Sequence, residues 1–141
     1  MVRAVHEPRD MGVRPRILVA DDDAALLDDV ASVLESVGEV TRAASGAELI
    51  EHLGEDGPYD LIVTDIAMPW MTGVQAVQAT RYAGLVTPVV VMTALRDPEV
   101  ADRVAALGGQ VVLLHKPFGV AELGAAISNL WPSLGSMVAS A

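Results

Sequence analysis

Short apolar runs and longer amphipathic stretches alternate along most of this chain. Five of the short runs have the length of β-strands, and most of them lack polar residues at alternate positions: Ile17–Ala20, Glu39–Arg42, Leu61–Thr64, Val89–Met92 and Val111–Leu114. Strands that are apolar on both faces are typical of a parallel sheet covered by helices on each side. The pattern therefore predicts such a sheet.

A helix is predicted after each strand, because apolar residues recur there at spacings of three and four. The fifth is indicated by apolar positions from Val120 to Leu130 and is expected to end before Pro132. The other four begin at residues that cap helix N-termini, which are Asp23, Ser45, Thr72 and Asp97. Five such units predict an α/β fold, a flavodoxin-like (βα)5 three-layer sandwich with parallel strands in the order 2-1-3-4-5.

The ends of the chain differ from its middle in composition. Residues 1–15 are polar, carry two prolines and show no periodicity, so we expect a flexible N-terminal arm. Residues 16–131 contain all the predicted strands and helices and form one domain. Residues 132–141 are small and weakly polar, which favours a frayed C-terminal tail, and no second domain is expected to follow.

Composition narrows the classes of function. A net charge of -10 repels phosphate backbones, and aromatic residues make up only 4% of the chain, so direct binding of nucleic acid is not expected. The chain has no cysteine, which excludes disulfides and thiolate metal sites. It also lacks a signal-peptide pattern and any run of 18 apolar residues, so we expect a cytoplasmic protein without a membrane segment.

Chemically distinctive residues follow four of the predicted strands. Asp21 and Asp22 come after the first strand and Asp65 after the third, while Thr93 follows the fourth. Lys116, the only lysine in the chain, follows the fifth. Because the carboxyl ends of parallel strands meet at one edge of the sheet, we expect these side chains to gather there.

Each of these residues also has an ordinary structural interpretation. Asp65 is the type of residue found in many loops, Thr93 suits a strand end, and Lys116 suits a solvated surface. One aspartate in the first acidic run is needed as a helix cap, and Asp23 is the natural one. The shared position of the others at one edge of the sheet favours a functional site.

Clustered carboxylates need a positive partner. Two unit charges 4 Å apart repel by ~4 kcal/mol at an effective dielectric constant of about 20. A shared proton is one way to offset this repulsion, and a divalent cation is another. An incomplete set of oxygen ligands suits Mg²⁺. A carboxylate beside Mg²⁺, with an ammonium and a hydroxyl nearby, is equipped to accept a phosphoryl group.

Four motifs now resemble those of receiver domains of bacterial two-component response regulators. The first strand with its acidic pair, Ile17–Asp23, resembles the family's first motif, and Leu61–Pro69 resembles its phospho-acceptor strand and loop. Val91–Ala94 resembles its switch threonine segment, and Leu114–Phe118 its lysine-proline turn. The resemblance covers about residues 16–131.

The resemblance implies a role for each matched residue. Asp65 corresponds to the aspartate that is phosphorylated by a sensor histidine kinase or a phosphotransfer protein. Mg²⁺ would be bound directly by Asp22, Asp65 and the backbone carbonyl of Ala67, and through a water by Asp21.

Further matched residues would respond to the phosphoryl group. Thr93 and Lys116 would contact its oxygens, and Pro117 would follow a cis peptide bond that turns the lysine inward. The family often has an aromatic residue three positions before the lysine, where this chain has Leu113. A switch at that position would therefore be non-aromatic.

The sequence thus predicts a stand-alone phospho-acceptor switch, not an enzyme, that signals through an unknown downstream protein. It would be a monomer or a phosphorylation-dependent dimer. An adaptor that works without phosphate and a fragment of a larger regulator or hybrid kinase remain alternatives. A haloacid-dehalogenase-like phosphatase is disfavoured, because that family expects a second aspartate where this chain has Ala67.

Overall fold

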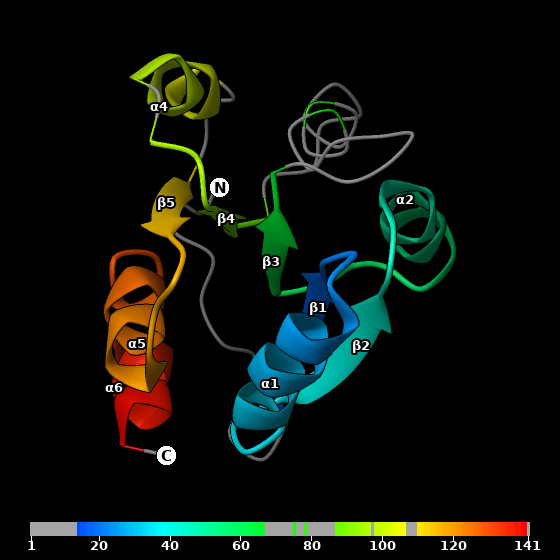
Figure 1. Cartoon of the computed structure of the whole chain (residues 1–141). Helices are drawn as coiled ribbons and strands as arrows, with labels where there is room; N and C mark the ends of the chain where they lie inside the picture. Colours follow the sequence, from blue (N-terminus) through cyan, green and yellow to red (C-terminus); the bar gives the residue numbers. More distant parts are fainter. Residues whose placement is uncertain are drawn as a thin grey trace, which may run out of the picture.

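The structure is a computed structural model that describes residues 14–66, 75, 78, 87–96, 98–106 and 110–140 (Figure 1). A five-stranded parallel sheet with the order β2-β1-β3-β4-β5 lies at its centre. Its strands are β1 (Arg16–Ala20), β2 (Glu39–Ala43), β3 (Leu61–Asp65), β4 (Val89–Thr93) and β5 (Val111–His115). The predicted strands and their order are confirmed, and each strand is one residue longer than predicted.

Helices cover both faces of the sheet (Figure 1). α2 and α4 lie on one side, and α1, α5 and α6 lie on the other. Their bounds are α1 (Ala24–Leu34), α2 (Gly46–Glu55), α4 (Pro98–Ala105), α5 (Val120–Ser128) and α6 (Pro132–Ala139). Of the predicted third helix only Gln75 and Gln78 are described, and both are helical. In the described segments, none of the helices has the length and apolar character needed to cross a membrane.

Alternate residues of each central strand enter two separate cores. Ile17 and Val19 of β1 pack on the side of α1, α5 and α6, whereas Leu18 and Ala20 pack on the side of α2 and α4. All residues of β3 and β4 are buried. This two-sided burial is the reason why the strands lack polar alternation.

Two predicted helix caps are present. The carboxylate of Asp23 accepts hydrogen bonds from the backbone N–H groups of Ala25 and Leu26 at the start of α1. At the start of α2 the hydroxyl of Ser45 accepts from the N–H of Glu48. Asp23 is therefore committed to the helix, which leaves Asp21 and Asp22 for other contacts. The predicted caps Thr72 and Asp97 lie outside the described residues.

The prediction of a frayed tail at residues 132–141 is wrong. α6 occupies Pro132–Ala139, and Leu134 and Val138 on one of its faces are buried in the core that α1 and α5 share. Pro132 does not stop α5, which ends at Ser128. It is instead the first residue of α6, a position where a missing N–H costs no hydrogen bond.

Candidate functional site

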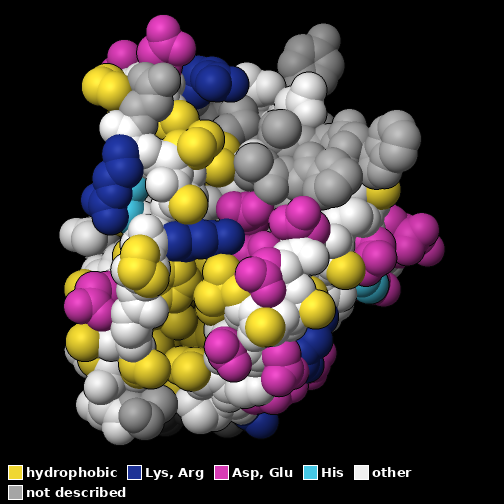
Figure 2. All heavy atoms as spheres, in the orientation of Figure 1, with side chains coloured by type: hydrophobic (Ala, Val, Ile, Leu, Met, Phe, Trp, Pro, Cys, Tyr) yellow, Lys and Arg dark blue, Asp and Glu magenta, His cyan; other side chains and the backbone are white. Residues whose placement is uncertain are grey.

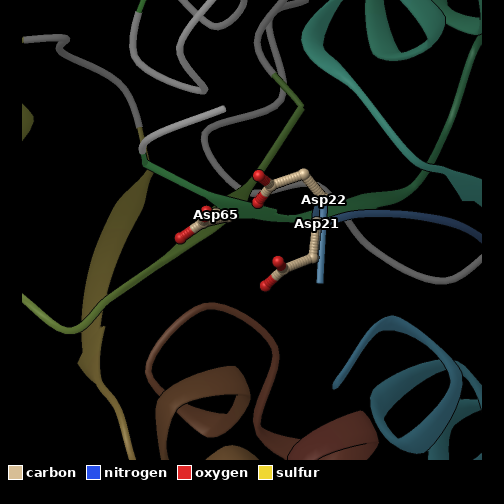
Figure 3. A group of neighbouring side chains, drawn as sticks. All are labelled: Asp21, Asp22 and Asp65. Carbon is tan, nitrogen blue, oxygen red and sulfur yellow. The ribbon is translucent and has the colours of Figure 1, made fainter. Parts of the chain in front are cut away.

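Three carboxylates meet at the carboxyl ends of β1 and β3. Asp21 and Asp22 directly follow β1, and Asp65 is the last residue of β3. The two strands are neighbours in the sheet, with Ala20 paired to Thr64. Figure 3 shows the three side chains around a common space, and one oxygen of each lies within 4.8 Å of the others. The predicted clustering of these aspartates is therefore observed.

The cluster is buried on one side and open on the other. Asp21 and Asp65 are only 1% and 6% exposed, whereas Asp22 is exposed. Oδ1 of Asp21 accepts a hydrogen bond of 2.8 Å from the backbone N–H of Asp23, which holds the carboxylate in place. A ligand from solvent can thus reach the cluster from the side of Asp22.

Lys116 joins the cluster from the opposite half of the sheet. Its Nζ donates to Oδ2 of Asp21 at 2.8 Å and to Oδ1 of Asp65 at 3.1 Å. Its backbone N–H donates to the carbonyl of Thr93 at 2.7 Å, which ties the residue after β5 to the end of β4. The peptide bond between Lys116 and Pro117 is cis, as the family resemblance implies.

The charges in this space do not balance. Among the residues that the structure describes, one ammonium faces three carboxylates, which leaves two negative charges uncompensated (3 − 1 = 2). Oxygen donors with an excess negative charge fit a small divalent cation such as Mg²⁺. Asp21, Asp22 and Asp65 are the residues that could hold it. The carbonyl of Ala67, which was predicted to join them, lies outside the described residues.

Electrostatics raises the pKa values of two site residues. Burial raises the pKa of Asp65 above its ordinary value of 3.8, and the charge of Asp21 raises it further, while the hydrogen bond from Lys116 acts in the opposite direction. Burial lowers the pKa of Lys116, but its hydrogen bonds to Asp21 and Asp65 outweigh that effect and raise it above 10.5. The ionised form of Asp65 is therefore destabilised without a cation.

We expect Asp65→Asn to stabilise the metal-free protein at pH 7. The pKa of Asp65 is higher in the folded than in the unfolded protein, so the folded state binds the proton more tightly. The free energy of unfolding therefore falls as pH rises from the unfolded-state pKa through the folded-state pKa. The stabilisation should shrink as pH falls toward 3.8, where Asp65 becomes protonated in both states. Urea unfolding in chelator at several pH values measures this difference.

The control for this prediction is Asp29→Asn, which removes an exposed carboxylate from α1 outside the cluster. This variant should keep the pH dependence of the wild type. If metal-free Asp65→Asn were less stable than the wild type at pH 7, the ion pair with Lys116 would outweigh burial and repulsion, contrary to our account.

Thr93 lies at the carboxyl end of β4, and Leu113 lies in the middle of β5, where it is paired with Val91. In the described part of the chain, the side chains of both residues lack a hydrogen bond to the clustered carboxylates or to the ammonium of Lys116. Thr93 is fully buried at the end of β4, and its hydroxyl accepts from the backbone N–H of Leu95 at 2.9 Å. Leu113 on β5 is partly buried and packs against the core on the side of α2 and α4. The side chains of Asp21, Asp65 and Lys116 are thus joined directly, whereas the hydroxyl of Thr93 is bound to its own loop.

An apolar hollow beside the cluster was missed by reasoning from sequence. It lies between α1 and α5 and is lined mainly by apolar side chains, including Val33, Phe118 and Val120 (Figure 2). Val120 is the first of the apolar positions that predict α5, yet it is 38% exposed. Its position as the first residue of that helix was the available signal.

Comparison with known proteins identifies the family of the chain. Residues 17–128 match the family described as the response regulator receiver domain. The chain belongs to this family. Receiver domains are phospho-acceptor switch domains of two-component systems, they generally bind Mg²⁺, and they work with a histidine kinase or phosphotransfer partner.

Similar proteins agree with this assignment. The chain is 38% identical over 116 residues to "Response regulator protein PmrA" of Pseudomonas aeruginosa, which covers 82% of this chain and 52% of that protein. It is 35% identical over 121 residues to "Transcriptional regulatory protein PdtaR" of Mycobacterium tuberculosis, covering 84% of this chain and 57% of PdtaR. This receiver chain therefore spans about half the length of these relatives.

Solved structures show the same fold. The chemotaxis response regulator CheY4 of Vibrio cholerae superimposes with a TM-score of 0.75 at 28% identity, covering 84% of this receiver chain and 99% of CheY4. The receiver domain of the Francisella response regulator 1452 superimposes with a TM-score of 0.74 at 29% identity, covering 87% and 98% of the two chains. The flavodoxin-like fold predicted from the sequence is thereby confirmed.

Proposed function

We propose that Asp65 accepts a phosphoryl group from a histidine kinase or a phosphotransfer protein in a Mg²⁺-dependent reaction. The observation that carries this proposal is the position of Asp65 at the end of a buried strand, where its carboxylate accepts from the ammonium of Lys116 and lies within 4.8 Å of two further carboxylates. The phosphorylated domain would then signal through altered protein contacts in the cytoplasm.

In the proposed transfer, one bond to phosphorus forms and another breaks, and two side chains contact the phosphoryl oxygens. A carboxylate oxygen of Asp65 forms the new bond to phosphorus, and the phosphorus–nitrogen bond of the donor phosphohistidine breaks, with its electron pair remaining on the imidazole. Lys116 compensates the negative charge on the phosphoryl oxygens. To do so, its Nζ gives up one of its two contacts with a carboxylate and forms a contact with the phosphoryl group. Thr93 supplies a hydroxyl donor.

Mg²⁺ would be held by Asp22, Asp65 and the carbonyl of Ala67, with Asp21 bound through a water. When bound, the ion supplies positive charge that offsets the repulsion between the carboxylates and the incoming phosphoryl group. Asp21, held by the N–H of Asp23, keeps the cluster in place. Loss of the phosphoryl group requires attack of water on phosphorus, which releases inorganic phosphate and restores Asp65.

Mg²⁺-dependent labelling tests this proposal. Incubation with Mg²⁺ and acetyl phosphate should raise the intact mass by one phosphate, and excess chelator should prevent it. Asp22→Ala removes one proposed ligand and one negative charge, so the Mg²⁺ concentration that gives half-maximal labelling should rise at least about tenfold. Asp29→Ala, which removes an exposed carboxylate outside the cluster, is the matched control and should behave as the wild type. Equal labelling with and without chelator would contradict the metal dependence.

A further inference from the structure

α6 lies outside the residues that match the family. The match ends at residue 128, the last residue of α5, and α6 follows at Pro132–Ala139 after the connection formed by residues 129–131. α5 and α6 lie side by side (Figure 1). A Cβ atom on Gly135 of α6 would lie 2.6 Å from the carbonyl oxygen of Gly124 of α5, so the two backbones approach closely. The proposed function does not involve this helix pair.

Apolar contacts and close packing hold α6 in place. Leu134 and Val138 on one of its faces are 2% and 0% exposed, and the helix has no charged residue. In the described part of the chain, the side chains of α6 form no hydrogen bond or ion pair with another element. A helix of eight residues is not stable alone in water, so α6 is helical because it is docked on α5. The α5 of another copy offers the same contacts.

The acidic residues of the chain are concentrated away from α5 and α6. Residues 14–66 carry 13 acidic and 3 basic side chains, a net charge of -10 (3 − 13 = -10). From Val120 to Ala139 the only charged residue is Glu122. Two copies that meet through α1 or α2 bring acidic surfaces together and repel each other, whereas copies that meet through α5 and α6 do not. Electrostatics therefore favours α5 and α6 as the place where a second copy of this chain can bind.

Pro132 determines how the connection between the two helices can open. If α5 continued through this residue, the proline ring would clash with the carbonyl of Ser128, and the N–H that a continuous helix needs would be missing. Pro132 also disfavours a helical backbone at Trp131, which has φ −154° and ψ 85°. α5 and α6 therefore cannot merge into one straight helix, and α6 folds back on the α5 of its own chain.

We propose that α5 and α6 form a self-association surface, on which α6 of one copy packs on α5 of a second copy, and that Pro132 holds this surface closed within one chain. An exchanged pair keeps every contact between α5 and α6, so only residues 129–131 have to rearrange. The short connection gives α6 a high effective concentration at its own α5, which favours the closed monomer at low protein concentration. Exchange needs no phosphoryl group, so it goes beyond the proposed function and is independent of it.

Pro132→Ala in the full chain tests the role of the proline. Alanine allows one continuous helix from Val120 to Ala139, which carries α6 away from its own α5. Because proline is far less favourable than alanine inside a helix, the association constant should rise at least about 100-fold, as measured by sedimentation equilibrium. The matched control is Pro98→Ala, which should associate as the wild type does, because Pro98 is also the first residue of a helix but the element before it is β4. An unchanged association constant in Pro132→Ala would overturn the proposal.

Mixing two variants tests whether α6 is the exchanged segment. In the Pro132→Ala background, Gly135→Val obstructs α6 and Gly124→Val obstructs α5, since a side chain at either glycine collides with the facing helix. Neither protein should dimerise alone. Their mixture should form a heterodimer in native mass spectrometry, because the intact α6 of the Gly124→Val copy can pack on the intact α5 of the Gly135→Val copy. A dimer of Gly135→Val alone, or a mixture without heterodimer, would overturn the exchange.

Amide hydrogen exchange keeps the proposal falsifiable if a valine variant does not fold. In the dimer of Pro132→Ala, α6 remains docked, so its backbone amides should be as protected as in the wild-type monomer. Fast exchange throughout α6 in that dimer would mean that the copies pair without docking α6, and it would overturn the proposal.

Discussion

Asp65→Asn is expected to reduce incorporation of a phosphoryl group by more than about 100-fold. The asparagine amide retains the shape of the side chain but lacks the nucleophilic carboxylate that forms the acyl phosphate. Asp65 is the last residue of β3, and its carboxylate shares the ammonium of Lys116 with Asp21. We expect no neighbouring carboxylate to replace it as the phosphoryl acceptor. Intact mass after incubation with Mg²⁺ and acetyl phosphate measures the effect.

Asp60→Asn is the matched control for this result. Asp60 is a buried aspartate just before β3, at the opposite end of the strand from Asp65, and one of its oxygens accepts from the backbone N–H of Arg16. Folded Asp60→Asn should incorporate phosphate as the wild type does. Labelling of Asp65→Asn at the wild-type level would show that a residue other than Asp65 accepts the phosphoryl group.

Gly135→Ala is expected to lower the free energy of unfolding by about 1–3 kcal/mol. A Cβ atom at this position would lie 2.6 Å from the carbonyl oxygen of Gly124 and would also collide with Ser128, because α5 and α6 pack closely at these residues. Backbone atoms of a packed helix cannot move aside easily. The loss should therefore exceed the gain in helix propensity from alanine. Urea unfolding measures the change.

Gly54→Ala provides the comparison. Gly54 lies in α2, and a Cβ atom there would have no neighbour within 4 Å. Alanine should therefore stabilise this helix by up to about 1 kcal/mol. A gain in stability from both substitutions would mean that α6 does not pack against α5 as described.

Much of the fold and site could be predicted because the sequence shows two patterns together: strands that are apolar on both faces, and polar residues directly after them. Runs such as Leu61–Thr64 are apolar on both faces, which requires cover on both sides of the sheet and thus a parallel arrangement. In such a sheet, residues after different strands converge on one edge. The positions of Asp21, Asp65 and Lys116 in the sequence therefore sufficed to predict their proximity, which the structure confirms.

α6 could not be predicted from the same patterns. The segment Pro132–Ala139 is only eight residues long, and its buried apolar side chains give little periodicity. Proline is compatible with both the end of one helix and the start of the next, and the choice depends on tertiary contacts. The close approach of Gly124 and Gly135 provides those contacts, and it involves residues 11 positions apart (135 − 124 = 11).

The hydrogen-bond partners of the site residues could not be predicted from the sequence either. A threonine at the end of a strand predicts a hydroxyl at the edge of the sheet but not which group it binds. The contact of Thr93 with Leu95 depends on the path of the chain after β4. Likewise, a single lysine predicts a cation near the carboxylates, whereas its sharing between Asp21 and Asp65 depends on side-chain geometry.

The most direct test of the central claim is to locate the phosphoryl group. Borohydride reduces an acyl phosphate of aspartate to homoserine, so labelled and reduced protein can be digested with trypsin and sequenced by mass spectrometry. Cleavage after Arg16, Arg42 and Arg81 separates the peptide with Asp21 and Asp22 from the peptide with Asp65. We predict homoserine at position 65, formed only when Mg²⁺ was present during labelling. Homoserine at position 21 or 22, or none at position 65 in protein that carries the phosphate, would contradict the account.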